Sequence, residues 1–174
     1  MHNRREYPRR ALSGLTLAVT LFGILATAAS AIPSRRLVWN ASASAPIGLY
    51  WRVDGRPAPG DLVLAWAPLW ARRVAAERQY LPSAVPLVKR VVAVDGDTVC
   101  AMGDAIDING ETVAHRLAFD RMRRPMPRWT GCQTLGPGEV FLLMGDVPDS
   151  FDGRYFGISD GHDINGLLVP LWTR

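Results

Sequence analysis

The chain has 174 residues, enough for one domain of ordinary size but short for two, because cores generally divide only beyond roughly 250 residues. Its 48% hydrophobic and 21% charged residues are typical of a folded protein and exclude disordered and low-complexity classes. The net charge is +4, but residues 1–10 hold four arginines and one glutamate, so that only +1 remains for the rest of the chain. A phosphate-binding surface for nucleic acid is therefore not expected.

An uncharged apolar stretch follows at residues 11–32. As a helix it would extend about 33 Å, enough to cross the roughly 30 Å hydrocarbon core of a bilayer once. The Arg-rich residues 1–10 would stay in the cytoplasm, which predicts a single-pass inner-membrane protein with residues 33–174 on the periplasmic side. Residues 29–31, Ala-Ser-Ala, also fit a signal-peptide cleavage site, so a cleaved signal segment remains open as an alternative. The anchor and the cleaved segment both send residues 33–174 to the same compartment, and a buried helix of a soluble protein is the third alternative.

The rest of the chain contains eight short runs typical of β-strands, each bounded by Pro, Gly, Asn or Asp. The expected strands are 48–53, 61–66, 88–94, 98–101, 105–108, 111–114, 140–144 and 167–171. Between two of them, Asn109-Gly110 predicts a tight hairpin. Only residues 67–80 have helical spacing, and residues 116–131 are expected to form an extended loop. The predicted fold class is mainly β.

Two cysteines, Cys100 and Cys132, fit an oxidising compartment, where an even count favours one disulfide. Such a cross-link would contribute on the order of 3 to 4 kcal/mol by the chain-entropy estimate. Two unpaired buried thiols are the alternative. The cysteines lack the spacing and the partners of a zinc site, so no metal is expected.

Histidine gives little support for a catalytic triad. His2 lies in the expected cytoplasmic tail, which leaves His115 and His162. His162 follows a glycine and precedes Asp163, so a turn residue capped by its neighbour is the expected role. A Ser-His-Asp mechanism is therefore not predicted.

Lys89 is the single lysine of the chain, whereas the other 19 of the 20 basic residues are arginines. Arginine cannot accept a proton at ordinary pH, but a buried lysine can shift its pKa far enough to act as a base. Lys89 lies in the apolar strand expected at 88–94, where desolvation would lower its pKa. The plain alternative is an exposed lysine on an edge strand.

Two other stretches carry hydroxyl and charged groups. Residues 40–50 place Ser42 and Ser44 among small residues before a Pro and a Gly, which leaves their backbone open to an extended peptide. A small-residue linker is the alternative there. Residues 144–157 hold the polar side chains of Asp146, Asp149, Ser150, Asp152 and Arg154. An Asp- and Gly-rich turn with an internal Asp-Arg pair is the alternative for this second stretch.

Together the three stretches resemble the Ser/Lys signal peptidases, and the first one resembles the TraF-type peptidases of conjugative plasmid transfer. The matching runs are Ser44-Ala45-Pro46-Ile47-Gly48-Leu49-Tyr50 for the nucleophile, Lys89-Arg90 with Gly96-Asp97 for the base, and Gly145-Asp146 through Ser150-x-Asp152-x-Arg154 to Gly157 for the last box. The resemblance covers nearly all of residues 38–157.

The resemblance implies a signal-peptidase-like β-barrel or sheet domain at residues 33–174, after one transmembrane helix, with no cofactor. It implies that Ser44 is the nucleophile and Lys89 the general base. Ser42 would help the Ser44 amide to bind the oxyanion, and Ser150 would orient the lysine amine. The remaining pair, Asp152 and Arg154, would hold the last box in place.

The implied function is a membrane-anchored serine endopeptidase that removes a leader or propeptide from an exported protein such as a pilin precursor. Three departures from general signal peptidases put a housekeeping role in doubt: Ala45 replaces a Met, Gly153 replaces a Ser, and Val147-Pro148 replaces a more polar turn. The alternatives are a general type I signal peptidase, or a non-catalytic tethered β module of a secretion machine.

Overall fold

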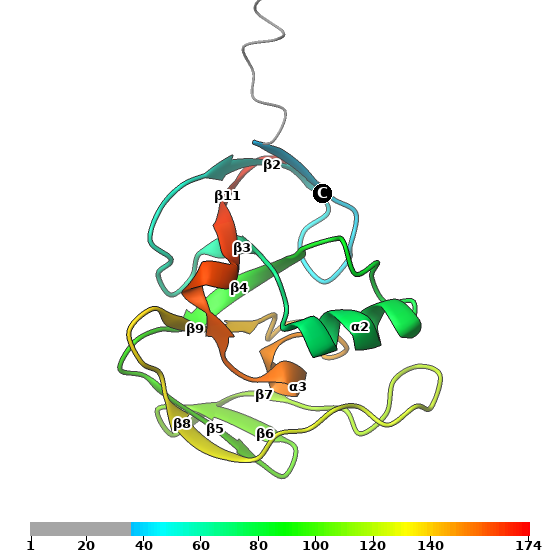
Figure 1. Ribbon diagram of the computed structural model, residues 1–174, viewed down its shortest axis with the longest axis vertical. Helices are drawn as coiled ribbons and strands as arrows, with labels where there is room; N and C mark the ends of the chain where they lie inside the picture. Colours follow the sequence, from blue (N-terminus) through cyan, green and yellow to red (C-terminus); the bar gives the residue numbers. More distant parts are fainter. Residues whose placement is uncertain (1–35) are drawn as a thin grey trace, which may run out of the picture. The chain divides into compact units, whose positions relative to one another are not determined.

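The computed structural model describes residues 36–174, drawn in colour in Figure 1. The expected tail at residues 1–10 and the expected anchor at 11–32 lie outside these residues. Within the described part, no helix combines the length and apolar character needed to cross a membrane.

The described residues are mainly β, as predicted. The strands are β1 (Leu37–Asn40), β2 (Gly48–Val53), β3 (Leu62–Ala65), β4 (Leu87–Ala93), β5 (Thr98–Met102), β6 (Ala105–Ile108), β7 (Glu111–His115), β8 (Gly131–Thr134), β9 (Glu139–Leu143), β10 (Ser159–Asp160) and β11 (Ile164–Thr173). The helices are α2 (Leu69–Glu77), α3 (Gly153–Phe156) and the 3-10 turn η1 (Gly161–Asp163).

The strands form two antiparallel sheets. The larger sheet has seven strands in the order β1-β2-β11-β3-β4-β9-β10, and the smaller has four in the order β7-β6-β5-β8. In Figure 1 the smaller sheet and the β2–β11 end of the larger one lie on opposite sides of β4 and β9. The strand β4 is therefore an interior strand, hydrogen-bonded to β3 on one side and to β9 on the other.

Each of the eight expected strands overlaps a strand of the structure, and three further strands were not predicted. Of these, β8 (Gly-Cys-Gln-Thr) is exposed along its whole length, so it has no apolar alternation to reveal it. The two-residue β10 is too short to leave a pattern, and β1 (Leu-Val-Trp-Asn) has three consecutive apolar residues, without the apolar–polar alternation that marks a half-buried strand.

The predicted helix at 67–80 is shorter in the structure, where it begins after Pro68 and ends at Glu77. Gln79 takes a positive φ of 60°, and the amides of Gln79 and Tyr80 donate to the carbonyls of Ala76 and Ala75. This is the Schellman arrangement that commonly ends helices, usually with a glycine at the positive φ. A glutamine there gave no signal in the sequence.

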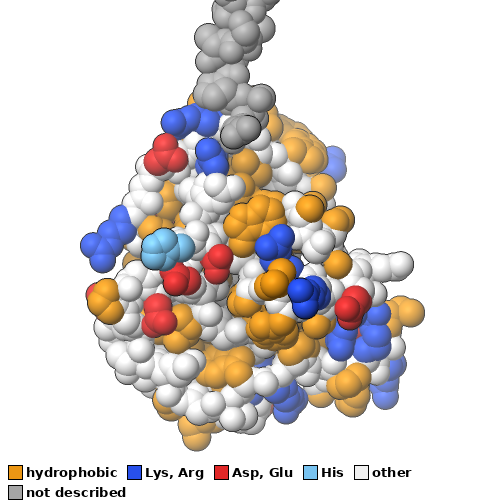
Figure 2. All heavy atoms as spheres, in the orientation of Figure 1, with side chains coloured by type: hydrophobic (Ala, Val, Ile, Leu, Met, Phe, Trp, Pro, Cys, Tyr) orange, Lys and Arg blue, Asp and Glu red, His pale blue; other side chains and the backbone are white. Residues whose placement is uncertain are grey.

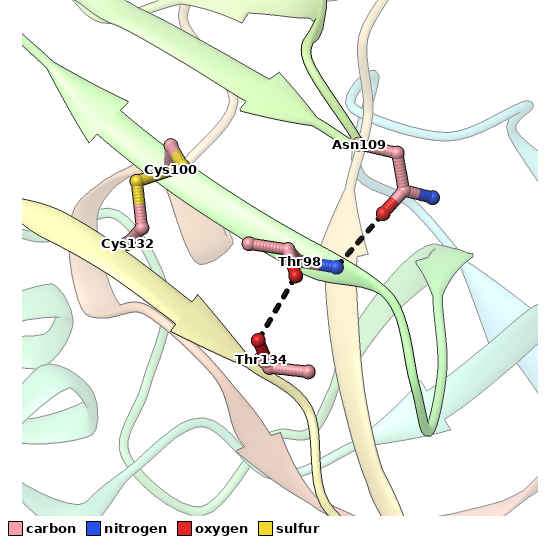
Figure 3. The surroundings of a disulfide bond; sticks show 5 residues. All are labelled: Thr98, Cys100, Asn109, Cys132 and Thr134. Atoms are coloured by element: carbon pink, nitrogen blue, oxygen red, sulfur yellow. Dashed lines mark hydrogen bonds between the residues drawn. A yellow bond between two sulfur atoms is a disulfide. The ribbon is translucent and has the colours of Figure 1, made fainter.

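The hairpin and the disulfide predicted in the smaller sheet are both confirmed. Asn109 and Gly110 have φ values of 52° and 86°, which a tight two-residue hairpin requires. Cys100 on β5 and Cys132 on β8 face each other across the strand pair and are joined by a disulfide (Figure 3). Beside it the hydroxyls of Thr98 and Thr134 hydrogen-bond at 2.9 Å, so the exposed strand β8 is held mainly by cross-strand links.

Candidate active site

Three segments far apart in the sequence meet at Lys89 on β4. They are β4 itself, the loop of residues 41–47 between β1 and β2, and the connection of residues 144–152 between β9 and α3. The amine Nζ of Lys89 lies 3.1 Å from Oγ of Ser44 and 2.8 Å from Oγ of Ser150. The structure thus brings the amine and the two hydroxyls into one hydrogen-bonded group.

Ser42 extends this group on the side of the loop. Its Oγ lies 3.0 Å from Oγ of Ser44, and the backbone N–H of Ser44 donates to the same Ser42 oxygen at 3.3 Å. An N–H and a hydroxyl are therefore next to the Ser44 hydroxyl, which is the pair of donors that an oxyanion would need.

The loop around Ser44 is held by Asn40, a residue that the sequence analysis did not single out. Asn40 is buried at the end of β1, and its Nδ2 donates to the carbonyls of Ser42, Ala45 and Pro46 at 3.0 to 3.1 Å. Its Oδ1 accepts from the Ser42 amide at 3.1 Å. The signal was an asparagine directly before a run of small residues, because Asn side chains commonly bond nearby backbone in turns.

The end of this loop requires a glycine at position 48, the first residue of β2. A Cβ at Gly48 would lie 2.1 Å from the carbonyl oxygen of Trp172 on β11, so no other side chain fits there. Two residues later the hydroxyl of Tyr50 donates to the Pro46 carbonyl at 2.6 Å. The loop is therefore fixed to the sheet at both ends.

Lys89 is a buried amine with a lowered pKa. The residue is only 2% exposed because β3 and β9 flank its strand, so the alternative of an exposed edge lysine is wrong. Burial lowers its pKa from 10.5 to about 8; the negative charge of Asp152 opposes this and the positive charge of Arg154 adds to it. At neutral pH a useful fraction of such an amine is free to accept a proton.

The last box is organised around a buried ion pair. Asp152 and Arg154 are 0% and 1% exposed, with Nε of Arg154 2.8 Å from the carboxylate. The same guanidinium donates to the carbonyls of Met144 and Pro148 at 2.7 and 3.1 Å. Since these carbonyls belong to the connection that carries Ser150, the pair sets the position of its hydroxyl.

The structure shows what surrounds two of the residues that depart from general signal peptidases, Gly153 and Ala45. A Cβ at Gly153 would lie 2.7 Å from the Leu142 carbonyl oxygen and 2.8 Å from the Phe141 ring, so a serine does not fit without a shift of β9. Ala45 is buried in an apolar cluster. Its other buried members are Tyr50, Leu64, Val88, Met144 and Leu168.

The histidines lie elsewhere. His115 pairs with Asp104 at 3.3 Å and His162 with Asp160 at 2.7 Å, all on the surface. His162 lies in a short turn, as predicted, but its carboxylate neighbour is Asp160 and not the adjacent aspartate. Residues 36–174 contain no group of three or more His, Cys, Asp or Glu side chains arranged to hold a metal ion.

The arrangement is suited to acid–base and nucleophilic chemistry. A partly exposed hydroxyl lies beside a buried amine of lowered pKa, the amine is oriented by a second hydroxyl, and amide and hydroxyl donors flank the first. A nucleophile, a base and an orienting group within hydrogen-bond reach are the parts that covalent catalysis requires.

Comparison with known proteins finds a family and curated relatives that this chain resembles over most of its length. The family described as signal peptidase, peptidase S26, matches residues 9–172. A plasmid transfer protein TraF of Escherichia coli is 34% identical over 95% of this chain and 97% of its own. A conjugal transfer protein TraF of Agrobacterium fabrum is 34% identical over 77% and 81%. Among solved structures, a signal peptidase I from Enterococcus faecalis V583 has a TM-score of 0.40 at 20% identity, covering 67% of this chain and 100% of that one.

Proposed function

The chain belongs to the signal peptidase family S26, and from that membership we propose that it is a membrane-anchored serine endopeptidase with a Ser44/Lys89 dyad. Its reaction is the removal of a leader or propeptide from an exported protein. The observation that carries the proposal is the buried Lys89 amine 3.1 Å from the Ser44 hydroxyl.

The reaction needs the neutral form of Lys89. Its lone pair accepts the hydroxyl proton as Ser44 attacks the scissile carbonyl, while one of its N–H groups keeps its hydrogen bond to the Ser150 hydroxyl. The protonated amine then passes its proton to the leaving amine of the substrate. Water, activated by the same Lys89 amine, releases the acyl group from Ser44.

The oxyanion is stabilised by groups already at the site. In the absence of substrate the Ser44 amide donates to Ser42. A substrate carbonyl oxygen entering the site replaces the Ser42 oxygen as acceptor, and the Ser42 hydroxyl turns to donate as well. One such donor typically contributes about 10² to 10³ in rate.

We predict that cleavage increases with pH through a midpoint near 8, the pKa to which burial lowers Lys89. Below this pH the amine is protonated and cannot accept the Ser44 proton, so kcat/KM falls about tenfold for each further pH unit. The measurement is kcat/KM on one peptide from about pH 5 to about pH 10. Replacing His115 and His162 by glutamine should leave the midpoint in place; a midpoint that moves with them would assign the titration to a histidine.

The substrate class is a precursor exported during conjugative transfer, a pilin-like protein. Support comes from the curated relatives, which are described as plasmid transfer and conjugal transfer proteins and match most of this chain. The loop at Ser44 also offers an uncluttered backbone between Ala43 and Ala45, to which an extended peptide with small side chains can pair.

The proposed location is the inner membrane, with residues 1–10 in the cytoplasm, 11–32 as the single span and 33–174 on the periplasmic side. An uncharged outer face of the larger sheet supports a position beside a membrane. In register across three strands it holds Leu37, Trp39, Leu49, Trp51, Val169 and Trp172. The rings of Trp39 and Trp172 stack at 6.1 Å and are both more than half exposed. Exposed tryptophans of this kind gather at membrane–water boundaries.

The test is co-expression of the full chain with a panel of exported precursors in membranes, read by product mass. We expect one pilin-like precursor to be cleaved by the parent chain and by Ser83→Ala, an exposed serine outside the site, but not by Ser44→Ala. Cleavage of most of the panel would favour a general type I signal peptidase. Unchanged biological function of Ser44→Ala would favour a non-catalytic tethered β module.

A further inference from the structure

The segment of residues 116–131, called the arm below, concentrates positive charge that the net charge conceals. It holds five arginines and one aspartate, whereas the rest of the chain after residue 10 is net negative. In Figure 1 the arm is the long loop between β7 and β8 that extends outward on the α2 side, and in Figure 2 Lys/Arg and hydrophobic side chains gather in this region.

The arm is a pre-ordered structure, because one carboxylate organises its tip. Asp120 accepts from the amides of Met122 and Arg124 at 2.9 and 2.8 Å through one oxygen. Its other oxygen accepts from the Tyr80 hydroxyl at 2.5 Å and from Nε of Arg124 at 2.6 Å. The tip therefore loses little conformational entropy when a partner binds to it.

The tip of the arm borders the residues around Ser150. Arg121 forms an ion pair with Asp149, the residue directly before Ser150. The ring of Tyr80, which is bonded to the tip, packs 5.6 Å from Phe151, the residue directly after Ser150. The tip is therefore linked to the residues on both sides of Ser150.

The outer side of the tip is both basic and apolar. Met122 is 72% exposed and Phe119 is 50% exposed. The guanidinium of Arg123 lies over the Phe119 ring at 5.7 Å, and within residues 36–174 no carboxylate is in ion-pair distance of it. The tip thus offers a fixed positive charge beside apolar side chains.

We propose that the arm is a docking site for an acidic segment of the precursor, next to the bond that is cut. This inference rests on the proposed peptidase function and adds to it the substrate feature that the enzyme selects. Charge complementarity identifies the occupant, since a carboxylate on a peptide matches the guanidinium of Arg123, whereas Arg121 and Arg124 are already paired with Asp149 and Asp120. The arm contacts no reacting atom, so it changes substrate binding and leaves the chemical step unchanged.

The experiment compares two fluorescein-labelled peptides with the same small-residue core, one with a tail of glutamates and one with a tail of glutamines. Binding is measured by anisotropy on the full Ser44→Ala chain in detergent, and cleavage is measured on the parent chain. We expect tighter binding and a lower KM for the glutamate peptide at equal kcat. The variant Arg123→Glu should reduce this preference by about 3- to 10-fold, and salt should weaken it.

The matched control is Arg56→Glu, the same charge change at an exposed arginine of the β2–β3 loop, which should retain the preference. Arg123→Gly removes the charge without backbone strain at a φ of 61°, so it separates docking from misfolding. Equal binding of both peptides, or an equal loss in Arg56→Glu, would overturn the proposal. So would loss of binding to phosphatidylglycerol vesicles in Arg123→Glu with the peptide preference intact. If the glutamate peptide binds more tightly but neither peptide is cleaved, the result supports the arm as a docking site and contradicts the proposed peptidase function.

Discussion

Replacing Lys89 by methionine is expected to reduce precursor cleavage by about 10²- to 10⁴-fold, the usual range for loss of a general base. Methionine has a similar length and fills the buried position between β3 and β9, but it has no lone pair on nitrogen for the Ser44 proton. The measurement is kcat/KM of the purified full chain on the precursor identified in the panel. Binding of the precursor should change little, because the amine acts on the nucleophile and not on the substrate.

The control for this variant lies one residue further along the same strand. Arg90 is exposed and donates to the Gly60 carbonyl at 2.6 Å, so Arg90→Met removes a basic group from β4 outside the site and should keep most of the activity. Lys89→Arg keeps the positive charge, but its guanidinium does not lose a proton at ordinary pH and so cannot act as a base. It should be as inactive as Lys89→Met. If Lys89→Arg cleaves the precursor, Lys89 is not the base.

Replacing Asp152 by alanine is expected to have the largest effect on stability, a loss of about 3 to 5 kcal/mol in the free energy of unfolding. The change leaves the Arg154 guanidinium buried without its counter-charge and removes an acceptor from the Met144 amide. It also removes the side chain that accepts from the first turn of α3. The measurement is urea unfolding of the full chain in detergent, followed by tryptophan fluorescence.

Two comparisons test whether the ion pair is the cause. Asp146 is an exposed carboxylate of the same connection, and Asp146→Ala should cost less than about 0.5 kcal/mol. The double variant Asp152→Ala/Arg154→Met should be more stable than Asp152→Ala alone, because it no longer buries an uncompensated charge. A double variant that is less stable than the single one would show that Arg154 stabilises the box through its bonds to backbone carbonyls.

Features that depend on residues adjacent in the chain could be predicted from the sequence. Eight strands were predicted because each has a short apolar run between turn residues. The hairpin at Asn109-Gly110 was predicted because these two residues readily take the positive φ values that a two-residue turn requires. The resemblance to signal peptidases rests on three local runs of residues, and the family match confirms it. The anchor at residues 11–32 stays a prediction.

Other features depend on what lies against a residue in three dimensions, and no local pattern contains that information. Whether Lys89 is an exposed edge lysine or a buried amine was decided by the pairing of β4 with both β3 and β9. The role of Asn40 depends on the loop of residues 41–47, which folds back over its side chain. The need for glycine at position 48 depends on β11, because a Cβ there would lie 2.1 Å from the Trp172 carbonyl oxygen. The sequence by itself thus determined which residues are candidates for the chemistry, because their types and order are local. The tertiary structure decided their burial, distances and charge environment, because these come from strands and loops that are far apart along the chain.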